Sequence, residues 1–331
     1  MYPRMNEPSV VVIGGGSGLS NMLRGLKKQT GKLTAIVTMA DDGGSSGRLR
    51  SDLGMPPPGD VRNCLGALAN TEPTMEKLLS YRFKEGELEG QSLGNLVLAA
   101  LNDISGSFYE AVCRLSEILA ITGRVLPVTT EDVRLKARFD DGTEILGESK
   151  ICDFKKAGAR RISSVELIPQ RPKALKESIR AIEEADLIIL GPGSLYTSII
   201  PNLLTEGVAE AIENSDAHKL YILNVATEDG ETEGYAASDH VSAIFKHGGR
   251  KLFDYCLANN TPFPKEMADR YAADGAGQTM VDIEELEHMG VHPIIMPLLE
   301  KDAIYARHDP EVLARAVMRI YREKSPTKIY F

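Results

Sequence analysis

The sequence predicts an α/β protein: a Rossmann-like, doubly wound and mostly parallel sheet with a small antiparallel insert at 130–170. Three observations support this fold class. Short β-branched apolar runs alternate with segments of helical periodicity along most of the chain. Glycine-rich turns follow two of these runs, at 14–18 and 191–193. The middle of the chain instead carries strand-like runs around an Asp-Gly turn. We expect one α/β domain over residues 1–331.

The amino-terminal elements form a strand–turn–helix–strand unit. Residues 9–13 are a short apolar run, which suits a strand buried on both faces. Apolar residues then recur at helical spacing across 19–26, and residues 33–39 predict a second strand. This order is typical of a right-handed parallel crossover.

Residues 40–60 interrupt this regular pattern with a long segment rich in Gly, Ser and Pro, the kind of loop that commonly carries function. In the insert we expect strands at 133–139, 143–149 and 161–168. Helices are predicted at 60–69, 92–101, 108–121, 173–185, 205–214 and 238–246 and from Asp309 onward, and strands at 186–190 and 219–225.

Composition narrows the functional classes. The 331 residues carry a net charge of −9 and show no basic stripe, which argues against nucleic acid as a partner. No apolar run approaches the roughly 20 residues of a membrane span, and the chain has no secretory leader pattern. The four cysteines are far apart, without a C-x-x-C pair. We expect a cytoplasmic protein.

The segment GGGSGLS at 14–20 places Gly15, Gly16, Ser17 and Gly18 where a strand meets a helix. Glycines let the backbone approach a phosphate, and the first N–H groups of a helix favour an anion. The alternative interpretation is a tight structural turn. Leu19 stands where the dinucleotide fingerprint needs its third glycine, and the turn has no P-loop lysine, so an NAD-linked oxidoreductase is disfavoured.

A second turn, GPGSLYTS at 191–198, supplies Gly193 and Ser194 after another buried strand. Ser194 is placed as a helix cap and Tyr196 is available to stack or to hydrogen-bond. Because ligands of open parallel sheets lie beyond the carboxyl ends of the strands, both turns can face one crevice. The alternative interpretation of 191–198 is a turn with a structural role alone.

Charged residues between the turns add candidate contacts. Asp41 and Asp42 follow the second strand, where an acidic residue can meet a ribose hydroxyl, a pair can hold Mg²⁺, or both can simply be solvated. Arg48 and Arg62 suit bidentate binding of phosphate. Asp60 opens a helix and serves equally well as a cap or a ligand.

Weaker signals favour structural roles. His288 and His292 have the spacing of metal ligands, but Gly290 and Pro293 make a continuous helix between them improbable. His240 suits a structural or capping role. The basic segment 155–161 is most simply a solvated patch.

Together these motifs resemble the gluconeogenesis factor family (YvcK/GlmR type), within the group related to the 2-phospho-L-lactate transferase CofD. The resemblance covers nearly the whole chain and is carried by GGGSGL, TMADDGGSSGRLR, PPGDVRNCLGALA, GNLVLAAL, GPGSLYTSIIPNLL and NVATEDGETEGY, with Asp-His at 239–240. The chain departs from the family pattern at Ser17, where Thr is frequent, and around Ala226 to Asp229.

The resemblance implies a cytoplasmic, Rossmann-like regulator that binds UDP-N-acetylglucosamine. Such proteins are needed for cell shape and wall precursor supply during gluconeogenic growth, and are described as stimulating glucosamine-6-phosphate synthase. By motif, the resemblance places these residues around the nucleotide sugar: Gly15, Gly16, Ser17, Gly18, Asp41, Asp42, Arg48, Arg62, Asn95, Gly193, Ser194 and Asn224.

The leading hypothesis is therefore a UDP-sugar-binding regulator that needs no metal or other cofactor and is not an enzyme. It forms a homo-oligomer or a monomer, a choice that the sequence leaves open. The alternative is a CofD-like transferase that moves a phosphorylated group from a nucleotide donor, with Asp41 and Asp42 holding Mg²⁺. No candidate general base with a partner stands out in the sequence, which favours the regulator.

Overall fold

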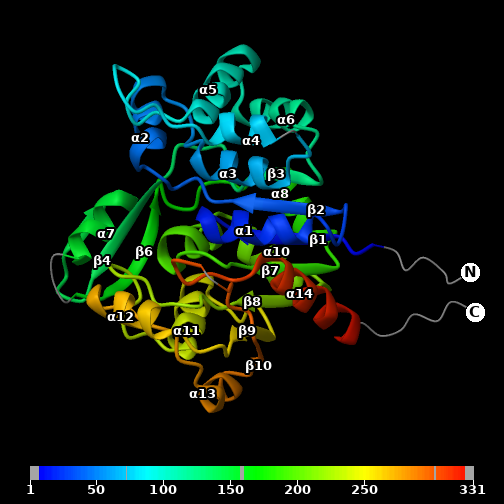
Figure 1. The fold of residues 1–331 in the computed structure, drawn as a ribbon, viewed down its shortest axis with the longest axis vertical. Helices are drawn as coiled ribbons and strands as arrows, with labels where there is room; N and C mark the ends of the chain where they lie inside the picture. The colour runs from blue at the N-terminus through cyan, green and yellow to red at the C-terminus, as the bar shows by residue number, and fades with distance from the viewer. Residues whose placement is uncertain (1–6, 72, 157–159, 302, 325–331) are drawn as a thin grey trace, which may run out of the picture.

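The structure is a computed structural model that describes residues 7–71, 73–156, 160–301 and 303–324 (Figure 1). Within this part, a seven-stranded parallel sheet has the order β10-β9-β8-β7-β1-β2-β3. Its strands are β1 (Val10–Gly14), β2 (Leu33–Val37), β3 (Arg124–Pro127), β7 (Leu187–Leu190), β8 (His218–Ile222), β9 (Tyr255–Asn259) and β10 (His292–Met296). The predicted α/β fold with a mostly parallel sheet is confirmed.

The strand order reverses at β1. From β1 the chain builds outward through β2 to β3, and it later returns to the other side of β1 and builds outward from β7 to β10. Val12 is in register with Ala35 of β2 and with Ile189 of β7, and its side chain is fully buried. A crevice therefore opens beyond the carboxyl ends of β1 and β7, the point where such sheets bind ligands.

A separate three-stranded antiparallel sheet has the order β5-β4-β6 and lies with α7 at one side of the molecule (Figure 1). Its elements are β4 (Arg134–Phe139), β5 (Glu144–Leu146), β6 (Ile162–Ile168) and the helix α7 (Glu148–Lys156). The predicted antiparallel sheet is confirmed, but the predicted strand 143–149 ends early. Gly147 has a φ of +112°, which turns the chain out of the strand and into α7.

Helices fill the connections between strands. Helix α1 packs between α14 and α3, and α1 and α14 lie side by side (Figure 1). They approach closely at Gly25, where a Cβ would lie only 1.8 Å from the carbonyl oxygen of Pro310. The helices are α1 (Gly16–Leu26), α2 (Gly44–Leu53), α3 (Gly59–Leu68), α4 (Pro73–Ser80), α5 (Leu93–Ser105), α6 (Phe108–Ile118), α8 (Lys176–Glu183), the π-helix η1 (Leu195–Ile199), α9 (Ile200–Leu203), α10 (Val208–Asn214), α11 (Ala237–Gly248), α12 (Lys265–Ala273), α13 (Ile283–His288) and α14 (Pro310–Lys324).

Several helices differ from the sequence prediction, and α4, α7, α12 and α13 were not assigned from the sequence. The segment 40–60 contains α2, a helix of Gly, Ser and Arg residues that has no regular apolar stripe to reveal it. The predicted helix 205–214 starts only at Val208, because Gly207 before it has a φ of +87°, outside the helical region. Helix α13 ends at His288 and His292 begins β10, so these histidines do not share a helix.

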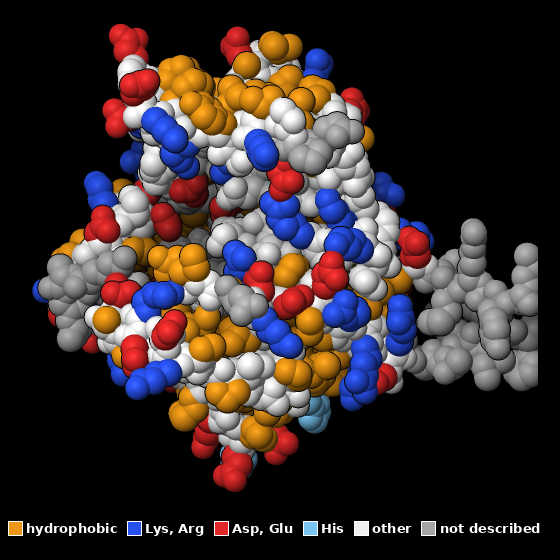
Figure 2. Space-filling model, viewed as in Figure 1, with side chains coloured by type: hydrophobic (Ala, Val, Ile, Leu, Met, Phe, Trp, Pro, Cys, Tyr) orange, Lys and Arg blue, Asp and Glu red, His pale blue; other side chains and the backbone are white. Residues whose placement is uncertain are grey.

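The surface is mixed in character (Figure 2). On the face shown, basic and acidic side chains are interspersed, while hydrophobic side chains gather at the end formed by α4, α5 and α6. Exposed large hydrophobic residues of that end include Met75, Leu78, Ile104 and Ile118. No helix in the described part of the chain is long and apolar enough to cross a membrane.

Candidate functional site

The carboxyl ends of β1 and β7 bring the two glycine-rich turns together. Strand β1 ends at Gly14 and α1 begins at Gly16, so Gly15 is the extended residue that precedes the helix and has no side chain to cap it. A Cβ on Gly18 would lie 2.9 Å from the carbonyl oxygen of Pro192. A side chain at this position would therefore push the two turns apart.

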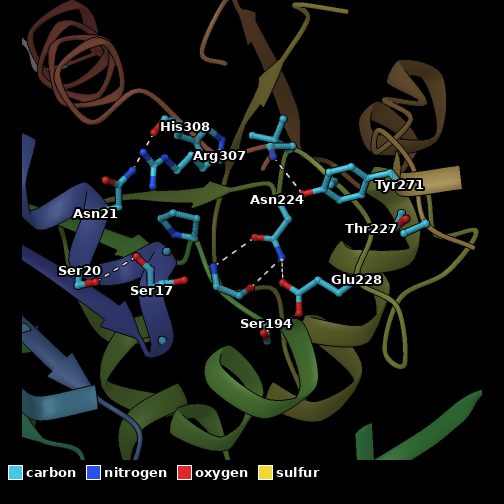
Figure 3. Close-up of a pocket in the computed structure, with 18 of the residues that line it drawn as sticks. Ser17, Ser20, Asn21, Ser194, Asn224, Thr227, Glu228, Tyr271, Arg307 and His308 are labelled. Carbon is cyan, nitrogen blue, oxygen red and sulfur yellow. Dashed lines mark hydrogen bonds between the residues drawn. The ribbon is translucent and has the colours of Figure 1, made fainter. Parts of the chain in front are cut away.

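The second turn is held by a side chain from the end of β8. The Asn224 Nδ2 group donates to the carbonyl oxygen of Gly193 at 2.9 Å, and Asn224 Oδ1 accepts the Gly193 N–H at 3.2 Å. Glu228 accepts hydrogen bonds from the Ser194 hydroxyl at 2.6 Å and from Asn224 at 3.2 Å. These contacts face a common cavity (Figure 3). Asn224 and Glu228 thus fix the shape of the turn.

The cavity beyond these turns has a volume of about 530 Å³, which suits a small organic ligand. The amino-terminal end of α1 forms one wall, and segments after β7, β8, α12 and β10 form the others. Its lining comprises Gly16, Ser17, Gly18, Ser20, Asn21, Arg24, Pro192, Gly193, Ser194, Asn224, Val225, Ala226, Thr227, Glu228, Asp229, Tyr271, Asp274, Ala276, Ala306, Arg307, His308 and Leu313.

The segment before α14 contributes a cation and an imidazole to this cavity. Arg307 is exposed and forms an ion pair with Glu300, an exposed contact that a ligand phosphate could replace at little cost. His308 is buried, and burial lowers its pKa to about 4, so its ring is neutral near pH 7. The Tyr271 hydroxyl accepts the Ala306 N–H at 3.0 Å and so connects α12 to this segment.

Six of the predicted site residues line the cavity. They come from the two glycine turns and from the end of β8, as the sequence predicts for turns that share one crevice. These residues are Gly16, Ser17, Gly18, Gly193, Ser194 and Asn224.

Five other predicted residues lie elsewhere, in a second polar region around the end of β2. Asp41 and Asp42 follow β2, whereas Arg48, Arg62 and Asn95 lie on α2, α3 and α5. None of them lines the cavity, and each meets protein groups instead. Arg48 donates to the carbonyl oxygen of Glu89 at 2.6 Å. Their role as ligand contacts stays a prediction.

Gly15 lies between the cavity and this second region. A Cβ at Gly15 would lie 2.6 Å from the Asp60 carboxylate and 2.7 Å from Thr38. The sequence leaves Asp60 as either a helix cap or a ligand, but α3 begins at Gly59, and the Asp60 carboxylate accepts the Gly16 N–H at 2.8 Å. The cap alternative is wrong because the carboxylate reaches across to α1, and the ligand alternative stays a prediction.

Carboxyl groups accumulate in the second region. Burial, followed by repulsion from Asp41, raises the pKa of Asp60 to about 6. Burial, followed by repulsion from Asp41, Asp42 and Asp60, raises the pKa of Glu148 to about 7. Ionising these acids therefore sets negative charges close together, a repulsion that a proton or a cation would relieve.

The carboxylates of this region are already partly engaged. Asp41 accepts the Gly43 N–H, and Asp42 accepts the N–H and the hydroxyl of Ser149, all at 2.9 Å. Among the residues that the structure describes, no three His, Cys, Asp or Glu side chains are grouped as metal ligands. A cation here would need further oxygens from a bound substrate.

Sequence reasoning missed Tyr271, Arg307 and His308. They lie far from the glycine turns along the chain, and no motif in the sequence connects them to these turns. Tyr196 makes a ring contact and hydrogen-bonds, as predicted, but within the protein: it is 3% exposed, and its ring and hydroxyl meet Tyr235, the hydroxyls at 2.9 Å, so it is not available to a ligand. His240 is fully buried against Tyr221, as a structural histidine would be.

Comparison with known proteins gives consistent results. Residues 10–299 match the family described as 2-phospho-L-lactate transferase CofD. A relative from Thermoanaerobacterium thermosulfurigenes is 55% identical over 317 residues, covering 96% of this chain and 98% of that protein. The gluconeogenesis factor of Bacillus subtilis is 45% identical over 318 residues, covering 96% of this chain and 99% of the relative.

The fold is also that of a solved structure. A Bacillus halodurans protein, described as a member of the UPF0052 family, is 44% identical and superposes with a TM-score of 0.90, covering 95% of this chain and 99% of its own. Full-length similarity at this level, together with the family match, extends over both glycine turns and the end of β8. The chain therefore belongs to the CofD family and, within it, to the gluconeogenesis factors.

Proposed function

We propose that this protein binds a nucleotide sugar in the cavity beyond β1 and β7 and acts as a regulator. The observation that carries the proposal is the pairing of an α1 amino terminus with the Asn224-held turn at the point where strand order reverses. Backbone N–H groups and a helix dipole at such a place favour a diphosphate.

The other walls suit the remaining parts of such a ligand. Arg307 adds a cation whose planar group matches phosphate oxygens. Tyr271 would offer its ring to a base or a sugar, and Asn21, whose Nδ2 donates to the His308 carbonyl oxygen, would offer its Oδ1 atom to a hydroxyl. The cavity volume of about 530 Å³ lies within the usual range for a site of this kind.

The ligand we favour is UDP-N-acetylglucosamine, on the strength of the resemblance to gluconeogenesis factors. In this proposal the protein works in the cytoplasm and is required for cell shape and wall precursor supply during growth on gluconeogenic carbon. Its partner would be glucosamine-6-phosphate synthase, which it would stimulate.

One observation favours a second candidate, a CofD-like transferase. The acidic region of Asp41, Asp42, Asp60 and Glu148 lies next to the α1 turn and carries unfavourable charge, which Mg²⁺ held with a phosphorylated substrate would neutralise. Under this candidate the two polar regions would hold the donor and the acceptor.

Calorimetry with the ligand-free protein tests the proposal. UDP-N-acetylglucosamine should bind and should raise the melting temperature, whereas free N-acetylglucosamine should do neither, since it lacks the diphosphate. At a ligand concentration 100 times Kd, the stabilisation should be about 2.7 kcal/mol. Failure of every UDP-sugar to bind would reject the regulator, and metal-dependent release of UDP or UMP would establish the transferase.

A further inference from the structure

The turn after β8 brings two glutamates together beside the cavity. Thr232 N–H and Glu231 N–H both donate to the carbonyl oxygen of Glu228, at 2.9 and 3.1 Å, which closes a tight turn over residues 228–232. Glu228 lines the cavity. Glu231 lies behind it and is only 2% exposed.

Only one of the two oxygen atoms of the Glu231 carboxyl accepts hydrogen bonds from N–H groups. Its Oε1 atom accepts the N–H groups of Tyr196 and Thr197, at 2.8 and 2.9 Å, at the start of η1. Its Oε2 atom is buried and meets no N–H or O–H donor. The neighbour in contact with this carboxyl is the side chain of Glu228. The buried Oε2 atom thus faces a second acid and no donor. Burying an acceptor without a hydrogen bond lowers the stability of the fold.

A proton between the two carboxyl groups would supply the missing hydrogen bond and remove the repulsion between two carboxylates. Burial first, and the neighbouring Glu228 second, raise the pKa of Glu231 well above its ordinary value. Two carboxylates this close cannot both ionise readily, and such pairs hold one proton in common. Glu228 then still accepts from Ser194 and Asn224, the contacts that fix the second glycine turn.

The tyrosines and the histidine around the pair do not titrate over the neutral range. Burial raises the pKa values of Tyr196, Tyr221, Tyr235 and Tyr271, and it lowers that of His240 to about 4. The Asp239 carboxylate faces Tyr196 and Tyr235 and accepts the Ala236 N–H, and Arg161 faces Tyr235. Arg24 and Arg307 line the same cavity as Glu228, but in the described structure they form ion pairs with Glu76 and Glu300.

We propose that Glu228 and Glu231 share one proton and that this proton makes the cavity competent to bind a diphosphate ester. Loss of the proton would leave two carboxylates that repel each other. This repulsion would move Glu228 away from Ser194 and Asn224, and the added negative charge would lie beside the ligand. The pair is thus a positioning and specificity element for anionic ligands. This inference rests on the proposed nucleotide-sugar function.

Titration calorimetry with UDP-N-acetylglucosamine between pH 5.5 and 9 tests the inference. For the wild type, Kd should increase with pH by up to about tenfold per unit, the limit for one linked proton. Heats measured in buffers of different ionisation enthalpy should show proton uptake on binding at high pH. Glu228→Gln and Glu231→Gln place an amide donor between the two groups and keep the acceptors, so both variants should bind with little pH dependence.

Glu233→Gln is the matched control. Glu233 belongs to the same turn region, accepts the Gly230 N–H at 2.5 Å and does not line the cavity. This variant also removes one negative charge, yet it should keep the pH dependence of the wild type. An equal loss of pH dependence in Glu233→Gln, or a wild-type Kd that is constant with pH, would overturn the inference.

A ligand-free measurement separates this inference from the proposed function. The melting temperature of Glu231→Gln relative to the wild type should rise from pH 5 to pH 8, since only the wild type loses the shared proton. If no UDP-sugar binds at any pH, the proposed function and the ligand half of the inference fail together. The melting temperatures then test the shared proton alone. A difference between the variant and the wild type that is constant with pH would reject it.

Discussion

Asp60 accepts the backbone N–H of Gly16 at 2.8 Å, so a carboxylate from α3 occupies the first donor of helix α1. A phosphate at this terminus would have to use the later donors of the turn, next to Ser17 and Gly18. The same contact joins the two polar regions, since Asp60 belongs to the acidic group and Gly16 lines the cavity.

Replacing Asp60 with asparagine should stabilise the protein at pH 8. The native pKa of about 6 exceeds the ordinary value of 3.8, so the folded state binds more protons between these two values. Wild-type stability therefore falls as pH rises through this window. A shift of about two units corresponds to about 3 kcal/mol, and we expect a gain of about 1–3 kcal/mol because the amide is a weaker acceptor.

Urea unfolding of Asp60→Asn and wild type at several pH values measures this gain. The difference in free energy of unfolding should be small near pH 4 and should reach its full size above about pH 7. Burial lowers the pKa values of His240 and His308 to about 4, and their destabilising effect in acid is common to both proteins and cancels. A variant less stable than the wild type at pH 8 would contradict the charge argument.

Gly18→Ala should destabilise the fold by about 1–3 kcal/mol, because its Cβ would lie 2.9 Å from the carbonyl oxygen of Pro192. Gly66 in α3 is the matched control, since a Cβ there meets nothing within 4 Å. Gly66→Ala should be neutral or stabilising by up to about 1 kcal/mol, as expected for a helix interior. Chemical denaturation compares the two variants, and equal effects would show that the turns are not closely packed.

Arg307→Gln should weaken UDP-N-acetylglucosamine binding by about 1.5–3 kcal/mol, because it removes a charge-assisted phosphate contact. Arg48→Gln removes an arginine that the sequence predicts as a ligand but that lies outside the cavity, against Glu89. We expect Arg48→Gln to have the smaller effect by calorimetry. A larger loss of affinity in Arg48→Gln than in Arg307→Gln would place the phosphate in the second polar region.

Chelation separates the two functional candidates. For the regulator, EDTA should leave the affinity for UDP-N-acetylglucosamine nearly unchanged, and Mg²⁺ should not strengthen it. For the transferase, Mg²⁺ should strengthen binding, and Asp41→Asn should remove this gain, since the metal would need the carboxylate charge. Calorimetry with and without Mg²⁺, alongside an assay for UDP and UMP, distinguishes these outcomes.

The local pattern of the sequence was enough to predict the elements that follow a simple period. The apolar runs of β1, β2 and β7 and the turn at Asp140-Asp141-Gly142 were recognisable, because buried strands and tight turns restrict residue type strongly. Helix α2 was not predicted, because its Gly, Ser and Arg residues leave no regular apolar stripe. Apart from α14, the elements after residue 250 were not assigned from the sequence.

By itself, the sequence determined the α/β fold class, the antiparallel insert and the two glycine turns at the mouth of the cavity. Only the tertiary structure separated the predicted site into two regions, with Asp41, Arg48 and Arg62 away from the cavity. Only the tertiary structure brought Tyr271 and Arg307 to it, from segments far along the chain. The physical reason is that a motif fixes local backbone geometry, whereas the neighbours of a cavity depend on strand order and on the packing of helices such as α1 against α14.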